Sequence, residues 1–151
     1  DDLAKANQVF SAIRELKLEL SFAWGGIINH EIYFGHLGDK GGEPTGKLLK
    51  QIVKDFGSFE NFKKDLKATG ISARGWVWTG WNYREGRLVN YLGDSQNTYT
   101  IWGVEPLVAL DTYEHAYFID YGVNRAGYID SFFENISWKV VEESFEDIVG
   151  C

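Results

Sequence analysis

The stretch RGWVWTGWNYREGRLVNYLG, residues 74–93, decides the fold class of this chain. Its two halves, RGWVWTGWN and RLVNYLG, are rich in aromatic and β-branched residues, and the turn segment YREG separates them. This pattern predicts a β-hairpin. Further along, VEPLVALD (residues 104–111) predicts a third strand with Pro106 near its start.

Helical patterns lie on both sides of these strands. From Leu3 to Leu37, apolar residues recur at steps of three and four, which predicts one long helix. Gly25 and Gly26 interrupt that pattern without a proline, so we expect a close approach of another segment there rather than a helix end. The other predicted helices cover residues 43–56, 58–70, 114–122, 126–136 and 138–149. Ser58 is the expected N-cap of the helix over residues 58–70.

These elements predict an α+β fold: a long N-terminal helix of a helical hairpin, then a three-stranded antiparallel sheet packed with helices. The segment GDKGGEPTG (38–46) is the expected linker, so we divide the chain into residues 1–42 and 43–151. The first part is expected to lack the other arm of its hairpin. The sequence contains no methionine, even at position 1, which leads us to expect a longer parent chain.

Composition excludes several classes of protein. The net charge is −7, and nucleic-acid binding requires clustered Lys and Arg, so no nucleic-acid partner is expected. No apolar run approaches the roughly 20 residues that span a bilayer, so no membrane partner is expected either. The only cysteine is Cys151, which rules out an internal disulfide and suits a reducing compartment. We therefore expect a cytoplasmic protein.

Candidate chemistry centres on LDTYEH, residues 110–115, which contains Asp111 and His115. Taken singly, Asp111 could cap the following helix, His115 could be a first-turn residue, and His30 could be a core histidine. Taken together, one Asp and two His in aromatic surroundings match the ligands of a first-row transition metal with an open coordination position.

The third histidine, His36, is expected to stay away from that site. Six residues separate it from His30, which is about 600° of helical rotation, so the two rings point in opposite directions. Only one of them is expected to face the core, and we assign that position to His30. We expect His36 to carry a cationic ring at the helix end, where the helix dipole favours positive charge.

Four segments carry a resemblance to the iron/manganese superoxide dismutases. DTYEHAYFIDY (111–121) resembles that family's D-x-W-E-H-A-Y-Y signature, and WGGIINHEIYF (24–34) resembles a helix that bears a ligand histidine. RGWVWTGWN (74–82) resembles the Trp-rich first strand, and NRAGYIDSFFENISW (124–138) resembles the C-terminal helices.

The resemblance implies that His30, Asp111 and His115 hold one Fe or Mn ion per subunit. It implies that Trp76 and Trp78 form a dry shell around the metal. The family has four protein ligands, and the first histidine and a gateway tyrosine have no counterpart in this sequence.

Other roles implied by the resemblance concern the metal's surroundings. Glu114 would reach across a homodimer interface to the partner's His115, and the assembly would be a dimer or a tetramer. Gln96 would hydrogen-bond the metal-bound solvent, and Gly26, four residues before His30, is also a manganese-type feature, so we favour manganese. The alternative for Gln96 is an exposed turn residue.

The sequence also departs from the family pattern in places. The signature Trp is Tyr113 and a signature Tyr is Phe118, so one hydroxyl is lost. Trp138 would lie in a later helical layer. Arg125 is expected either to attract the anionic substrate or to form an interface salt bridge.

The function implied is the disproportionation of superoxide to oxygen and hydrogen peroxide. The alternative is a metal-poor, non-catalytic member of the same fold that acts as a structural or interaction subunit. A zinc hydrolase with Glu114 as general base is a weaker interpretation because the chain lacks an H-E-x-x-H motif.

Overall fold

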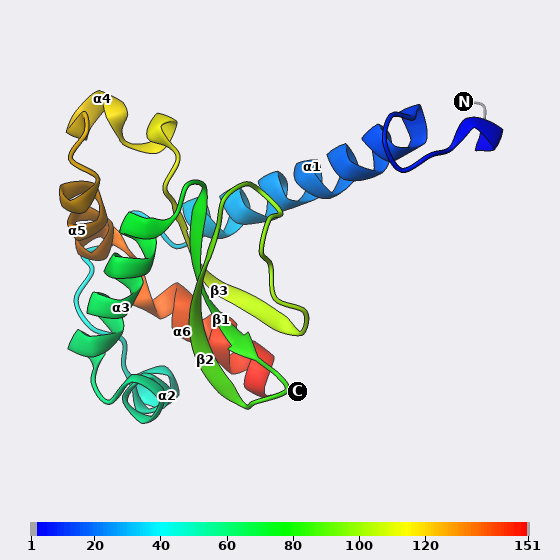
Figure 1. Ribbon diagram of the computed structural model, residues 1–151. Helices are drawn as coiled ribbons and strands as arrows, with labels where there is room; N and C mark the ends of the chain where they lie inside the picture. Colours follow the sequence, from blue (N-terminus) through cyan, green and yellow to red (C-terminus); the bar gives the residue numbers. More distant parts are fainter. Residues whose placement is uncertain (1–2, 151) are drawn as a thin grey trace.

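The computed structural model describes residues 3–150, so Cys151 lies outside the described residues. It confirms the α+β fold, with a long helix followed by a small antiparallel sheet surrounded by helices (Figure 1). The helices and strands are α1 (Ala12–Gly35), α2 (Gly46–Phe56), α3 (Phe59–Ser72), β1 (Trp76–Asn82), β2 (Arg87–Gly93), β3 (Val104–Asp111), α4 (Phe118–Tyr121), α5 (Arg125–Asn135) and α6 (Trp138–Val149). Two 3-10 turns, η1 (Leu3–Lys5) and η2 (Glu114–Ala116), complete the order.

The first helix begins later than the sequence predicts. The expected start at Leu3 is wrong, because α1 begins at Ala12. Asn7 explains the difference: its side-chain oxygen accepts hydrogen bonds from the N–H groups of Val9 and Phe10, at 3.0 and 2.8 Å. An asparagine that satisfies nearby backbone donors in this way competes with helix formation.

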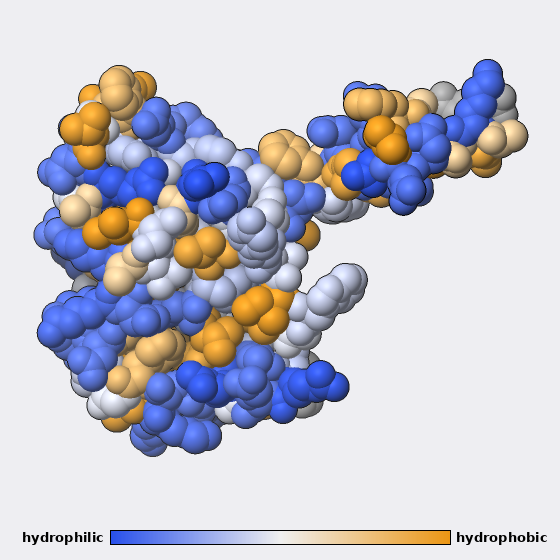
Figure 2. Space-filling model, in the orientation of Figure 1, coloured by the Kyte–Doolittle hydropathy of each residue, from blue (hydrophilic) through white to orange (hydrophobic). Residues whose placement is uncertain are grey.

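Much of α1 extends beyond the body of the molecule (Figure 1). Its apolar side chains are correspondingly exposed: Leu16 is 55% accessible, Phe22 41% and Trp24 57%. Figure 2 shows apolar surface on this projecting segment. Despite that apolar character, none of the helices within residues 3–150 combines the length and hydropathy that crossing a bilayer requires.

The sheet has the order β2-β1-β3, with β1 antiparallel to both neighbours. Its register places Trp76 between Gly93 on β2 and Asp111 on β3. A bulge between Thr79 and Gly80 interrupts the pairing opposite Pro106. Pro106 lies on an edge strand, where a missing N–H is tolerated. The register thus brings the first β1 residue next to the end of β3.

Helices cover the sheet and close the core. α1 and α6 pack on β3, α3 packs on β1 and β2, and α2 packs on β2. Ser58 caps α3 as predicted, accepting a hydrogen bond from the Asn61 N–H at 3.0 Å. Large side chains with at most 1% exposure fill the interior, each stabilising the fold by about 1.5–3 kcal/mol. They include Phe62, Leu66, Trp76, Trp78, Leu110 and Ile129.

Candidate metal centre

Three predicted ligand residues meet at the junction of α1, β3 and η2. His30 comes from α1, Asp111 is the last residue of β3, and His115 lies in η2. One ligand atom of each lies within 4.8 Å of the others. The structure therefore brings together side chains that are far apart in the sequence, and it does so within the range that a single ion could bridge.

The His30 ring has a defined orientation. Its Nδ1 lies 2.6 Å from the carbonyl oxygen of Gly26, one turn earlier on α1. A carbonyl only accepts, so Nδ1 carries the hydrogen and Nε2 of the neutral ring presents a lone pair. That Nε2 lies 3.5 Å from Asp111 Oδ2. Gly26 therefore fixes the tautomer that a metal ligand requires.

Asp111 is the buried centre of the group, with 1% exposure. Its Oδ1 accepts a hydrogen bond from the Tyr113 N–H at 2.9 Å, whereas Oδ2 faces His115 Nε2 at 3.0 Å as well as His30. Burial raises the pKa of the Asp111 carboxyl, and the Tyr113 N–H, His115 and His30 oppose that rise. Two imidazole nitrogens that converge on a buried carboxylate fit a transition-metal cation.

Behind the three residues lies a network built on indole groups. Trp76, which is fully buried, meets the His30 ring edge-on with centroids 5.0 Å apart. Its Nε1–H donates to Gln96 Oε1 at 2.8 Å. Gln96 is half-buried and its side chain contacts Trp76, so it is not the solvent-exposed turn residue of the alternative interpretation.

Asn29 is a residue of this network that sequence reasoning missed. Its Oδ1 accepts from Trp78 Nε1 at 3.0 Å, and its Nδ2 donates to the Gln96 carbonyl at 3.0 Å. Trp78 thus supports the site through Asn29, one layer behind Trp76. The sequence did offer a sign of this role, because Asn29 is a polar residue next to His30 in an otherwise apolar stretch of the helix.

Two tyrosines were also missed. Tyr128 Oη donates to the Asp111 carbonyl at 2.8 Å, and Tyr33 Oη lies 2.9 Å from Tyr128 Oη. Burial raises the pKa of both phenols, so both remain protonated at neutral pH. Nothing in the local sequence pattern pairs these residues, because 95 positions separate them.

His36 corrects the sequence-based expectation. It is 2% exposed, and its Nε2 accepts a hydrogen bond from the Ala109 N–H of β3 at 3.2 Å. Burial lowers the pKa of His36 to about 4, so the ring is neutral. The prediction of a cationic ring was wrong because the ring is buried against β3, where loss of water disfavours the charged form. The prediction that His36 points away from the core was wrong because α1 ends at Gly35, so helical rotation does not set the direction of residue 36.

The same correction applies to the choice between the two histidines. His36 is more buried than His30, whose side chain is 32% exposed, so assigning the core position to His30 was wrong. The expectation that the two rings serve different sites is confirmed, because the Ala109 N–H occupies His36 Nε2.

Arg125 and Trp138 lie away from the three residues. Arg125 donates to the carbonyls of Ile71 and Ala73 at the end of α3, and to the Tyr117 hydroxyl. This is a helix-terminus role that neither sequence interpretation considered. Trp138 is buried against Phe59, with ring centroids 5.3 Å apart, in the helical layer that the sequence predicted.

The outer side of the site is open and apolar. His115 has a side-chain exposure of 59%, and Glu114 beside it is exposed. The next residues, on and after α4, expose apolar side chains: Phe118 55%, Ile119 93% and Val123 93%. Figure 2 shows apolar surface at the corner that α4 occupies in Figure 1.

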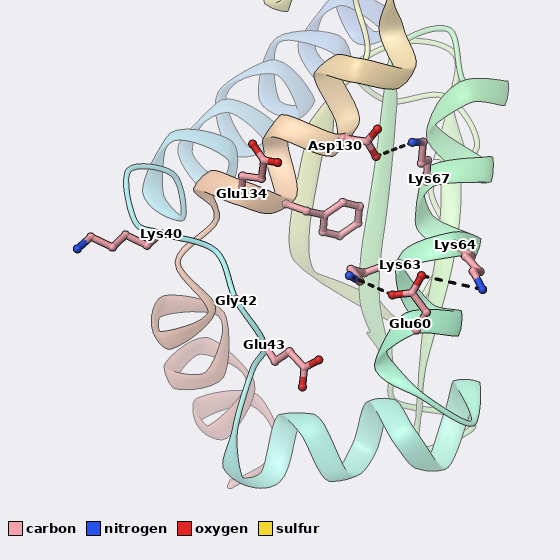
Figure 3. A pocket seen from close by; sticks show the side chains of 10 residues that line it. Lys40, Gly42, Glu43, Glu60, Lys63, Lys64, Lys67, Asp130 and Glu134 are labelled. Atoms are coloured by element: carbon pink, nitrogen blue, oxygen red, sulfur yellow. Dashed lines mark hydrogen bonds and ion pairs between the residues drawn. The ribbon is translucent and has the colours of Figure 1, made fainter.

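A groove of about 700 Å³ lies away from the three clustered residues, between α3, α5 and the segment before α2 (Figure 3). Its walls carry opposite charges that pair with each other, as Lys63 and Lys64 do with Glu60, and Lys67 with Asp130. None of the three clustered residues lines it. The chemistry of the site therefore does not extend into this groove.

Comparison with known proteins gives matches along almost the whole chain. The family model for iron/manganese superoxide dismutases, C-terminal domain, matches residues 44–144. The protein named iron superoxide dismutase in Aquifex aeolicus is 47% identical over 146 residues, which cover 96% of this chain and 68% of that protein. The protein named iron superoxide dismutase in Methanothermobacter thermautotrophicus is 40% identical, and the match covers 98% of this chain and 75% of that protein. A protein named manganese superoxide dismutase in Halobacterium salinarum is 36% identical over 122 residues, which cover 80% of this chain and 61% of that protein.

Proposed function

Because the chain belongs to the iron/manganese superoxide dismutase family, we propose that it converts superoxide to oxygen and hydrogen peroxide at one metal ion. His30, Asp111 and His115 would hold that ion through Nε2, Oδ2 and Nε2. The observation that carries this assignment is the convergence of these atoms within 4.8 Å around a buried carboxylate. A metal-dependent oxidoreductase is the class of enzyme to which such a chain belongs.

The redox chemistry would come from an iron or manganese ion held by these three residues, which can alternate between the +3 and +2 states. Over one cycle, two superoxide anions and two protons become one oxygen molecule and one hydrogen peroxide, so charge and atoms balance. The protein's part is to hold the ion, exclude bulk water and tune the potential. Asp111 contributes a buried negative charge, which favours the +3 state.

Gln96 would tune the site from the second layer. Its Oε1 accepts from Trp76, so its side-chain nitrogen is the donor that remains to face metal-bound solvent. Hydrogen bonds of this kind adjust both the potential of a metal and the acidity of its bound water. The indole of Trp76 meanwhile keeps one face of His30 dry.

The metal is iron or manganese. Gln96 and Gly26 are the manganese-type features of this sequence, whereas the relatives at 47% and 40% identity are named as iron enzymes. The same set of nitrogen and oxygen ligands binds both ions, so the choice depends on the geometry of surrounding hydrogen bonds.

We further propose a homodimer, or a tetramer built from such dimers, formed through the face around His115. The exposed apolar side chains of Phe118, Ile119 and Val123 provide the buried core that such an interface needs. Glu114 of the partner subunit would then accept from His115 Nδ1–H and hold the ring in its ligand tautomer.

Metal analysis with an activity assay tests the proposal. The purified protein should contain close to one iron or manganese ion per chain and should inhibit the reduction of cytochrome c by superoxide. A metal-free protein without this activity would instead indicate the non-catalytic alternative.

A further inference from the structure

Two buried hydroxyl groups link α1 and α5 to the backbone of Asp111. Tyr128 Oη lies 2.8 Å from the Asp111 carbonyl, and Tyr33 Oη lies 2.9 Å from Tyr128 Oη. A carbonyl accepts only, so the single hydrogen of Tyr128 points to Asp111. Tyr33 must therefore donate to Tyr128. Because each hydroxyl has one hydrogen, the direction of both bonds is set: Tyr33 donates to Tyr128, and Tyr128 donates to Asp111.

The peptide group that receives this chain is held at both ends. Its carbonyl accepts from Tyr128, while its N–H, from Thr112, donates to the Gly75 carbonyl at 2.8 Å. The next N–H, from Tyr113, binds Asp111 Oδ1 at 2.9 Å. Because a peptide group is planar, fixing it also fixes the position of the Thr112 Cα. The next peptide group starts from that atom, and its Tyr113 N–H holds one carboxylate oxygen of Asp111. Oδ2 is then the oxygen that faces the two histidines.

The two phenols have little freedom to move. Tyr33 stacks on Phe132 with centroids 6.3 Å apart and an interplanar angle of 5°. Tyr128 stacks on Tyr117 at 5.1 Å. Both tyrosines are buried, with exposures of 9% and 6%. In such a dry setting, a hydroxyl that accepts one hydrogen bond becomes a stronger donor of the next, so Tyr33 strengthens the Tyr128 bond.

On the basis of the proposed function, we propose that Tyr33 and Tyr128 are positioning residues that orient Asp111 and raise the reduction potential of the bound metal. The Tyr128 O–H directs the positive end of its dipole at the Asp111 backbone, which offsets part of the field of the carboxylate. Without that dipole, the +3 state of the metal is favoured more strongly. Hydrogen bonds around ligands are a general means of setting metal potentials.

Phenylalanine variants of the holoenzyme test the proposal through the midpoint potential, measured by redox titration. Tyr128→Phe should lower the potential by about 59 mV, a tenfold change in the ratio of oxidised to reduced metal for one electron. Tyr33→Phe should shift it less and in the same direction. The double variant should match Tyr128→Phe, because Tyr33 acts only through Tyr128.

Tyr117→Phe is the matched control, since it removes a buried hydroxyl from the ring stacked on Tyr128 but not from the chain that ends at Asp111. Its potential should equal that of the wild type. An unchanged potential in Tyr128→Phe, or a double variant that shows the sum of the two single shifts, overturns the proposal. If Tyr128→Phe does not fold, the shift in Tyr33→Phe decides.

A second measurement separates this proposal from the proposed function. In the metal-free chain, hydrogen exchange of the Tyr113 amide should be faster in Tyr128→Phe than in the wild type, and unchanged in Tyr117→Phe. Equal exchange in all three proteins would overturn the positioning role even if the wild type is an active metalloenzyme. Faster exchange in Tyr128→Phe supports that role even if the wild type binds no iron or manganese.

Discussion

Gly25 lies so close to Gln96 that a Cβ atom on the glycine would be 2.2 Å from the Gln96 carbonyl oxygen. The contact is between two backbones, one in the middle of α1 and one in the segment between β2 and β3. It confirms the close approach predicted from the glycine pair. It also explains how α1 carries both a ligand histidine and the support for Gln96.

This contact predicts that Gly25→Ala is destabilising. The added methyl group forces α1 and the Gln96 segment apart, and overpacking of this kind costs about 1–3 kcal/mol. Thermal or urea unfolding would measure the loss, and a changed absorption spectrum of the metal would report the displacement of Gln96.

Gly26→Ala is the matched control. A Cβ at Gly26 would lie 3.6 Å from the Gln96 side chain, which is ordinary van der Waals contact. Within a helix, alanine is favoured over glycine by about 0.5–1 kcal/mol, so this variant should be as stable as the wild type or more stable. Equal destabilisation of both variants would contradict the backbone-contact argument.

Removing a ligand should abolish metal retention. His115→Ala leaves Asp111 Oδ2 with one histidine instead of two, and the variant should lose its metal on dialysis against a chelator. His36→Gln, which changes a histidine outside the cluster, should retain it. Elemental analysis after dialysis measures both, and full metal content in His115→Ala would exclude His115 as a ligand.

Gln96→Ala should separate metal binding from metal tuning. The variant loses the hydrogen bond from Trp76 and the donor proposed to face metal-bound solvent, but none of the three proposed ligands. We therefore expect bound metal with lower activity and a shifted spectrum. Asn97→Ala, in the same segment, removes contacts to Ser21 on α1 and to the neighbouring Ser95, and it should behave as the wild type. Identical activity in both variants would leave Gln96 without a functional role.

His36 should make the fold sensitive to mild acid. Its pKa is about 4 in the folded state against an ordinary 6.5, so as pH falls the unfolded chain takes up this proton first. The free energy of unfolding should therefore be unaffected above pH 6.5 and fall between pH 6.5 and about 4. One unit of pKa is worth about 1.4 kcal/mol, so the total loss is roughly 3 kcal/mol.

His36→Gln tests this dependence, because the amide oxygen can accept the Ala109 N–H without titrating. Urea unfolding at several pH values between 4 and 7 should show a flatter profile for the variant than for the wild type. Parallel profiles would mean that His36 contributes nothing to the acid sensitivity.

The apolar face on and after α4 predicts a further effect. Ile119→Lys places a charge on a side chain that is 93% exposed in the single chain and buried in the proposed dimer, so it should shift the protein toward monomers. Tyr83→Lys, an exposed position in the β1–β2 turn, serves as the control. Sedimentation velocity measures both, and an unchanged oligomer in Ile119→Lys would place the interface elsewhere.

Local sequence patterns predicted the elements of this fold well. The three strands begin and end within about two residues of their predicted positions, and Ser58 caps α3 as expected. Such features depend on side-chain alternation and on contacts between neighbours in the chain, which the sequence states directly. There were two exceptions. At the start of α1, the side chain of Asn7 competes with the helix. Over residues 114–122, the 3-10 turn η2 and the four-residue α4 replace the single predicted helix.

The sequence by itself determined the α+β class, the order of the elements and the chemical identity of the candidate ligands. Only the tertiary structure decided which side chains meet. In the folded chain His36 is buried, and Arg125 hydrogen-bonds the backbone at the end of α3. Tyr33 hydrogen-bonds Tyr128, which in turn hydrogen-bonds the Asp111 carbonyl. These contacts join residues that are 17 to 95 positions apart. They depend on how helices pack against the sheet, and periodicity within one segment carries no information about that packing.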